Sequence, residues 1–193
     1  MANGIKLIAG LGNPGSRYVD TRHNAGFWFV EELADRYHGN WQEERRFKAR
    51  VCNVVIDNER IWLIAPQDYM NHSGEAIAAF ARYYRIDVGQ ILVAHDELDI
   101  LPGRVKLKQG GGAAGHNGLR DTTQHLGSPD YLRLRLGIGH PGKHSSVVNF
   151  VLTRPPEAEM TLIRSAIDHA ADHIGEIIQG DLQLAMNALH SHS

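Results

Sequence analysis

The chain has 193 residues, of which 42% are hydrophobic and 22% charged, and its formal net charge at pH 7 is -2. These values are those of an ordinary globular protein, and they argue against a disordered, fibrous or repeat protein. The slightly acidic balance excludes binding of nucleic acid through an overall basic surface, so any such binding has to be local.

The length predicts one domain covering residues 1–193. The longest apolar stretches are strand-like, and Met1–Lys6 lacks the apolar core of a signal peptide, so we expect a cytoplasmic protein without a membrane segment. A single cysteine, Cys52, excludes a disulfide framework and a multi-cysteine metal site. We expect no redox cofactor.

The first predicted strand is Ile5–Ala9, and the sequence Gly-Leu-Gly-Asn-Pro-Gly follows it at residues 10–15. Apolar residues spaced as on one face of a helix predict a helix over Phe27–Tyr37, and Asn24 is a plausible cap for it. Val51–Ile56 and Arg60–Ala65 flank a short polar turn, which predicts an antiparallel hairpin.

The glycines at 10, 12 and 15 also match the pattern of a dinucleotide-binding loop. Such a site needs a helix that begins at the glycines and a strand-helix-strand crossover after it. Here Pro14 and a polar run to Arg22 intervene, and the next two strands form a hairpin. A tight turn is therefore the favoured interpretation of the glycines.

Further along the chain, Ile77, Phe80, Ala81 and Tyr84 repeat the helical spacing, and a short buried strand over Ile91–Ala94 ends at a polar loop that begins with His95-Asp96-Glu97. This loop is the second group of polar side chains that follows a predicted strand.

Two segments alternate apolar and basic residues, 105–108 and 132–136, which predicts two half-exposed strands with their cations on one face. A glycine-rich loop at 110–118 lies between them and leads into a helix over Leu119–Leu126. The tail is predicted to be helical from about 156 to 190, with a buried stripe that includes Leu162, Ile163 and Ala166. Mixed strand pairing with helices between the strands predicts a single three-layer α/β/α domain around a twisted mixed β-sheet.

Six short motifs, in order along residues 5 to about 152, resemble those of the bacterial-type peptidyl-tRNA hydrolase family. They are Gly10–Gly15, Thr21-Arg22-His23-Asn24-Ala25-Gly26, Tyr69-Met70-Asn71 with Ser73-Gly74, His95-Asp96-Glu97-Leu98-Asp99, Gly115-His116-Asn117-Gly118-Leu119 and Gly137-Ile138-Gly139-His140-Pro141. The resemblance implies an enzyme that hydrolyses the ester between a peptide and the 3′-terminal ribose of tRNA, without a metal or cofactor.

The resemblance assigns the general base to His23, and a neutral imidazole near pH 7 suits the removal of a proton from water. It gives Asp96 the role of the carboxylate that orients this imidazole and stabilises the cation that forms. The alternatives are a surface histidine in a polar loop and a turn-forming aspartate.

The family pattern also places three amides around the pocket, Asn13, Asn71 and Asn117. By resemblance, Asn13 takes part in catalysis and distinguishes a blocked from a free amino terminus, while the other two contact the tRNA end. Asn71 and Asn117 could also act as helix caps. Further pocket and tRNA contacts are implied for Met70, His116, Tyr18 and Tyr69, the tyrosines by stacking on an unpaired base or, alternatively, as ordinary core aromatics.

Lys106, Lys108 and Arg135 resemble the family's clamp for the tRNA 5′ phosphate. For Arg133 and Lys143 a solvated charged face is the favoured interpretation. The sequence departs from the usual family pattern at Ala114, where another glycine is common, and at Asp68 and His72, which puts the flexibility of the glycine-rich loop and the shape of the peptide pocket in question.

Two other functions are compatible with parts of the sequence. His169 with His173, or His140 with His144, has the spacing of metal ligands, but the first pair is predicted to face water and Pro141 breaks any helix between the second pair. A noncatalytic RNA-binding module would use the basic strands, but it would not need His23, Asp96 and three amides together. The expected partner is peptidyl-tRNA, through its acceptor end and 5′ phosphate, and the family resemblance implies a monomer with no obligate protein partner.

Overall fold

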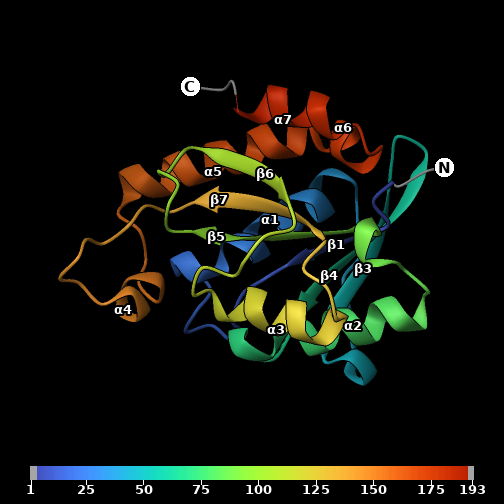
Figure 1. Cartoon of the computed structure of the whole chain (residues 1–193), viewed down its shortest axis with the longest axis horizontal. Helices are drawn as coiled ribbons and strands as arrows, with labels where there is room; N and C mark the ends of the chain where they lie inside the picture. The colour runs from blue at the N-terminus through green and yellow to red at the C-terminus, as the bar shows by residue number, and fades with distance from the viewer. Residues whose placement is uncertain (1–3, 191–193) are drawn as a thin grey trace.

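A mixed β-sheet forms the middle layer of the computed structural model, which describes residues 4–190 (Figure 1). Its strands follow the order β2-β3-β4-β1-β5-β7-β6. The central pairs β4-β1, β1-β5 and β5-β7 are parallel, whereas β2 with β3, β3 with β4 and β6 with β7 are antiparallel. The bounds are β1 Leu7–Gly10, β2 Gln42–Glu44, β3 Ala49–Ile56, β4 Glu59–Pro66, β5 Ile91–Glu97, β6 Val105–Gln109 and β7 Leu132–Gly137.

Helices cover both faces of this sheet, which confirms the predicted three-layer α/β fold and the predicted hairpin of β3 and β4. One face packs on α1 (Ala25–Arg36), α5 (Glu157–Asp172), α6 (Ile174–Ile178) and α7 (Leu182–His190). The other face packs on α2 (Ser73–Tyr83) and α3 (Asn117–Leu126), which lie below the sheet in Figure 1. The short helix α4 (Val147–Val151) stands out at one end. Single 3₁₀ turns occur at Arg22–Asn24, Arg45–Phe47, Met70–His72 and Val88–Gln90.

The helical tail consists of three helices and not one: the chain leaves helical geometry at His173 between α5 and α6, and Gly180, with a φ of 85°, turns it between α6 and α7. Apolar periodicity continues across such a turn, since each helix presents its own apolar side to the sheet. The prediction that Leu162 belongs to the buried stripe was wrong, because this side chain is 48% exposed. The prediction that His169 and His173 face water was also wrong, because both are half-buried and their ring centroids lie 4.9 Å apart.

The glycines after β1 serve close packing of the first helix. A Cβ atom on Gly10 would collide with the backbone of Gly26 in α1, and one on Gly12 would collide with the ring of Phe27. Helix α1 begins only at Ala25, so its amino end does not face the glycine run as a dinucleotide site requires. This packing holds the segment before α1 against the carboxyl ends of β1 and β5.

Among residues 4–190, no helix has the length and apolar character needed to cross a bilayer.

Candidate active site

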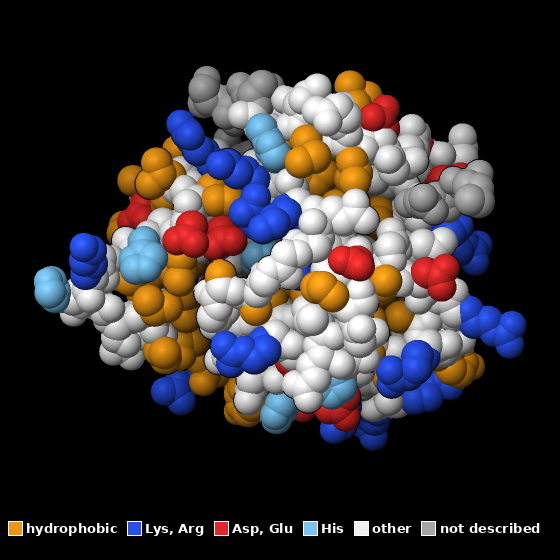
Figure 2. Space-filling model, in the orientation of Figure 1, with side chains coloured by type: hydrophobic (Ala, Val, Ile, Leu, Met, Phe, Trp, Pro, Cys, Tyr) orange, Lys and Arg blue, Asp and Glu red, His pale blue; other side chains and the backbone are white. Residues whose placement is uncertain are grey.

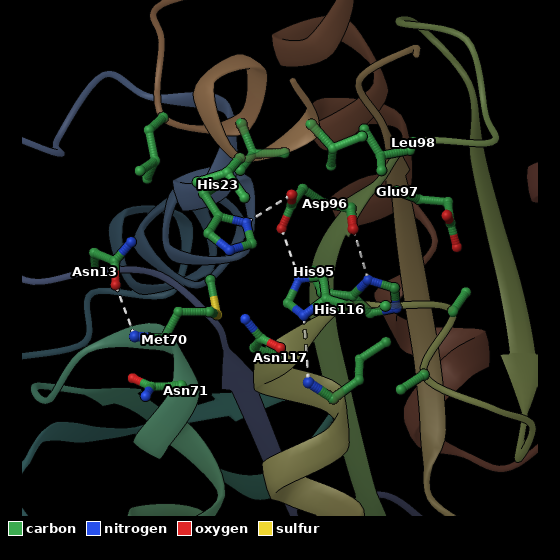
Figure 3. Close-up of a pocket in the computed structure, with 18 of the residues that line it drawn as sticks. Asn13, His23, Met70, Asn71, His95, Asp96, Glu97, Leu98, His116 and Asn117 are labelled. Atoms are coloured by element: carbon green, nitrogen blue, oxygen red, sulfur yellow. Dashed lines mark hydrogen bonds and ion pairs between the residues drawn. The ribbon is translucent and has the colours of Figure 1, made fainter. Parts of the chain in front are cut away.

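A cavity of about 530 Å³ opens at the carboxyl end of β5. Several segments that are distant in the sequence supply its walls: the loop after β1, the turn before α1, the turn before α2, the end of β5, the glycine-rich loop before α3, and α4 (Figure 3). Most of the site residues predicted from the sequence line it, namely Asn13, His23, Tyr69, Met70, Asn71, Asp96, His116 and Asn117.

Asp96 lies at the centre of this site and bridges two histidines. Its Oδ2 is 2.8 Å from Nδ1 of His23, and its Oδ1 is 2.8 Å from Nε2 of His116. Asp96 is buried, whereas the two imidazoles lie at its border. His95 and Asp96 lie within strand β5 and not in a loop after it, so the backbone carrying the carboxylate is held by the sheet.

These contacts define the tautomers of both rings. A carboxylate can only accept, so His23 donates from Nδ1 and its Nε2 carries a lone pair when the ring is neutral. For His116, the backbone N–H of Leu119 donates to Nδ1 at 3.3 Å, which leaves Nε2 as the donor to Asp96. His23 therefore has a basic nitrogen free for chemistry, whereas both ring nitrogens of His116 are engaged.

The electrostatics favour an ionised aspartate beside a basic imidazole. Burial disfavours the charged form of His23, but the charge and hydrogen bond of Asp96 outweigh it and raise the pKa of His23 above its usual 6.5. Burial acts against the Asp96 carboxylate as well, yet the two histidines hold the pKa of Asp96 well below its usual range.

His95, one residue before the aspartate, is a neutral and fully buried neighbour. Burial and the nearby His116 lower the pKa of His95 to about 3. Its Nδ1 lies 2.8 Å from the carbonyl oxygen of Asp96 and donates to it, which steadies the backbone at that residue. This role of His95 was not predicted from the sequence, because nothing in residue type or spacing distinguishes it from the rest of its motif.

Asn13 is held by three hydrogen bonds, one to Met70 and two to Asn24. Its Oδ1 accepts from the N–H of Met70 at 2.7 Å, and its own backbone N–H and carbonyl bond the side chain of Asn24 at 2.8 and 3.0 Å. Asn24 occupies the predicted N-cap position of α1, but its side chain makes no cap hydrogen bond, because both of its polar atoms bond Asn13. The Nδ2 group of Asn13 has no acceptor within the described part of the chain, and the residue lines the cavity.

The other two amides do not act as helix caps. His116, and not Asn117, caps α3 by accepting from Leu119, and Asn117 is the first residue of that helix. Asn71 is exposed in the 3₁₀ turn before α2, whose cap position is His72. Figure 3 shows Asn13, Asn71 and Asn117 grouped around the side chain of Met70. Three amides thus converge on one part of the cavity.

Neither of the two predicted tyrosines is a core aromatic, and one of them lines the cavity. Tyr69 is 58% exposed and lines the cavity, while Tyr18 is half-buried outside it, with ring centroids 6.4 Å apart. Such accessible aromatic edges suit contact with an unpaired base.

The predicted cations lie outside the cavity, on strands β6 and β7. Lys106 pairs directly with Arg135 across the two strands, and Lys108 pairs with Arg133. Arg133 is buried and donates to the carbonyls of Gly111 and Gly112, so its assignment to a solvated face was wrong. Its strand β7 is consequently covered on both faces and not half-exposed. Lys106, Lys108 and Arg135 have no ion pair with a described acid.

The departures from the family pattern have local structural roles. Ala114 adopts a φ of +48°, a conformation that glycine enters at lower cost, in the loop that lines the cavity. Asp68 and His72 contact each other, with Oδ2 and Nδ1 3.3 Å apart, from the two sides of the segment 69–71. The two substitutions are therefore complementary to each other.

An apolar wall faces the histidines, and sequence reasoning missed it. It consists of Leu98, Val147, Val148, Val151 and Leu152. Val148 is 66% exposed, although apolar side chains of a short helix usually pack against the protein. Unburied valines next to a polar centre suit the side chains of a bound peptide.

A metal ion could in principle use the central trio, since one donor atom each of His23, Asp96 and His116 lie within 4.8 Å of one another. Two imidazoles and a carboxylate are ligands for zinc and similar ions. The alternative of metal-dependent hydrolysis therefore moves from the histidine pairs considered in the sequence to this trio.

Comparison with known proteins gives a consistent result. The family model for peptidyl-tRNA hydrolase matches residues 7–193. The chain is 52% identical over 187 residues to the peptidyl-tRNA hydrolase of Halorhodospira halophila, covering 97% of this chain and 96% of that protein. It is 47% identical over 191 residues to the one from Neisseria gonorrhoeae, covering 99% and 100%. The crystal structure of peptidyl-tRNA hydrolase from Acinetobacter baumannii superposes with a TM-score of 0.95 at 46% identity, covering 99% of this chain and 96% of that one.

Proposed function

The chain belongs to the peptidyl-tRNA hydrolase family and hydrolyses peptidyl-tRNA, and we propose that His23 is the general base of this reaction, oriented by Asp96. The observation that carries the proposal is the hydrogen bond between Nδ1 of His23 and Oδ2 of Asp96, which leaves Nε2 as the basic nitrogen in a residue that lines the cavity.

In the proposed reaction, Nε2 of His23 removes a proton from a water molecule while the water oxygen attacks the ester carbonyl. The imidazolium that forms is stabilised by the ionised Asp96. When the tetrahedral intermediate collapses, the bond to the terminal ribose oxygen breaks, and that oxygen receives the proton from His23. The products are a peptide with a free carboxyl group and tRNA with a free terminal hydroxyl.

The three amides serve substrate placement in this proposal. The unused Nδ2 of Asn13 donates to a backbone carbonyl of the peptide next to the ester, which a blocked amino terminus provides. Asn71 and Asn117 bind the terminal nucleotide, and Tyr18 and Tyr69 stack on unpaired bases of the acceptor end. Met70, His116 and the apolar wall formed by Leu98, Val147, Val148, Val151 and Leu152 enclose the peptide.

The decisive experiment is hydrolysis of a small peptidyl-nucleotide ester by chelator-treated protein. This substrate has no folded tRNA that needs magnesium, so EDTA acts only on the protein. We expect full turnover with EDTA and no gain from added zinc, because the base is an imidazole. Loss of turnover with EDTA and its return with zinc would instead favour a metal held by His23, Asp96 and His116. Absence of turnover under both conditions, with intact tRNA substrates also uncleaved, would contradict the hydrolase assignment itself.

Every proposed catalytic group comes from one chain, so we propose that a monomer is sufficient and that the enzyme acts in the cytoplasm, where its substrate forms. Activity that is proportional to protein concentration over a wide dilution range would support the monomer.

We propose further that Lys106, Lys108 and Arg135 bind the 5′ phosphate of the tRNA. The three side chains project from neighbouring strands, and none of them forms an ion pair with a described acid. Replacing Lys108 or Arg135 with alanine should raise KM for whole peptidyl-tRNA and reduce the salt dependence of binding by about one counterion per lost contact. Turnover of the small ester, which carries no 5′ phosphate, should stay near the parental value.

Arg60→Ala is the matched control, because Arg60 is an exposed cation on β4, far along the sheet from β6. It should change neither substrate's kinetics. Equal loss on both substrates in the Lys108 and Arg135 variants would mean that these residues support the scaffold of the site, and the phosphate clamp would have to be abandoned.

A further inference from the structure

The carboxyl end of α7 contacts the exposed edge of the sheet beside the proposed clamp. Strand β6 is an edge strand, so the N–H groups that alternate with those bonded to β7 have no partner strand, and the N–H of Leu107 is one of them. His190, the last residue of α7, provides it: the backbone N–H of Leu107 donates to Nε2 of His190 at 2.9 Å. Leu107 itself lies between Lys106 and Lys108 in the sequence.

This hydrogen bond determines the tautomer of the His190 imidazole. A backbone N–H can only donate, so Nε2 of His190 carries a lone pair and the proton of the neutral ring is on Nδ1. No acceptor for that Nδ1–H is found among residues 4–190. His190 is exposed, so this donor is accessible from outside the protein.

The surroundings of His190 keep its imidazole neutral, and the cations nearby attract an anion. Partial burial lowers the pKa of His190, and the cations Lys106 and Arg135 lower it further. The hydrogen bond to Leu107 places the ring at the strand position between Lys106 and Lys108. Figure 2 shows lysine and arginine side chains gathered over this part of the sheet, with a histidine beside them below the grey chain end. Acidic side chains lie next to these cations in the same view, but Lys106, Lys108 and Arg135 form no ion pair with a described acid.

We propose that His190 also binds the 5′ phosphate, in addition to the guanidinium of Arg135 and the two lysines. Its Nδ1–H donates a hydrogen bond to the phosphate that these cations attract. This inference rests on the proposed clamp and adds a binding residue from the last helix. An uncharged donor fixed by the sheet edge sets the position of the phosphate, whereas the long side chains of Lys106 and Lys108 supply charge but little geometry. Helix α7 then acts in substrate recognition in addition to covering the sheet.

The test compares one peptidyl-tRNA prepared with a 5′ phosphate and with a 5′ hydroxyl. The measured quantity is the ratio of the two kcat/KM values. His190→Leu should lower this ratio about fivefold, mainly through KM, as expected for a lost hydrogen bond to a charged group at an accessible site. His190→Gln should restore part of it, because the glutamine amide offers both an acceptor for Leu107 and a donor for the phosphate.

Two controls separate the possible outcomes. Asn187→Ala removes an exposed hydrogen bond to Gln183 on the same helix and should leave the ratio at the parental value. Arg135→Ala should lower the ratio, which tests the clamp itself. A lower ratio with Arg135→Ala but not with His190→Leu would overturn the role of His190 alone. Equal loss on both substrates with His190→Leu, accompanied by a lower melting temperature, would show that His190 only caps the strand edge. An unchanged ratio in both variants would overturn the clamp and this inference together.

Discussion

His23→Ala is expected to lower kcat for peptidyl-tRNA by about 10³- to 10⁴-fold, the upper range for loss of a general base. The reason is that Nε2 of His23 is the one free basic nitrogen of the Asp96 trio, because Leu119 and Asp96 occupy both ring nitrogens of His116. The cavity, its amides and the proposed clamp remain, so tRNA binding should change little. Single-turnover hydrolysis and binding of uncharged tRNA measure the two effects separately.

The fold of this variant should remain intact. His23 lies at the border of the cavity and not in either apolar cluster, so its loss removes a contact with Asp96 but no core packing. Thermal unfolding of the parent and the variant checks this. A matched variant, His116→Ala, should retain more activity, since it loses a partner of the carboxylate and not the base. Near-parental turnover of His23→Ala would contradict the mechanism, and a greater loss in His116→Ala would transfer the role of the base to His116.

The sequence predicted the layers of the fold, because their signals are local. Alternating residues marked β6, and the short polar turn after Ile56 marked the hairpin of β3 and β4. The same local signals misplaced Arg133, since alternation of apolar and basic residues does not show that the glycine-rich loop folds back over the strand and accepts from the guanidinium. A segment distant in the sequence decided the burial of that cation.

In the site, likewise, motifs predicted some residues, whereas contacts between distant segments were not predicted. His23 and Asp96 were predicted as a pair, through the family resemblance, and the structure brings them to 2.8 Å. The second histidine on the same carboxylate was predicted only as a pocket wall. Asn24 occupies the predicted cap position of α1 but makes no cap hydrogen bond, and His116 takes the cap position considered for Asn117. Each of these contacts joins residues on different loops or depends on how a loop enters a helix. Residue type and spacing alone do not determine them.

Asp96→Asn should reduce kcat by about 10²-fold, less than removal of the base. An asparagine keeps the shape of the side chain, but it offers one acceptor where two N–H groups now donate, from His23 and His116. If its amide N–H faces His23, it favours the tautomer with the proton on Nε2, which cannot act as the base. The imidazolium formed during the reaction also loses its neighbouring charge.

The pH dependence of kcat should also change in a defined direction in the Asp96→Asn variant. In the parent, Asp96 raises the pKa of His23 despite burial, so activity falls as the pH is lowered through a value above 6.5. In the Asn variant only the effect of burial remains, which lowers the pKa of His23, so the acid limb of the kcat profile should move to lower pH. Glu97→Gln is the matched control, because it removes the adjacent half-buried carboxylate, which makes no hydrogen bond to His23 in the described structure. It should leave the acid limb near its parental position. An Asp96→Asn variant with the parental rate and pH profile would show that Asp96 only holds the end of β5. An equal shift of the acid limb in Asp96→Asn and Glu97→Gln would mean that the pKa of His23 depends on the general charge near the cavity and not on its hydrogen bond to Asp96.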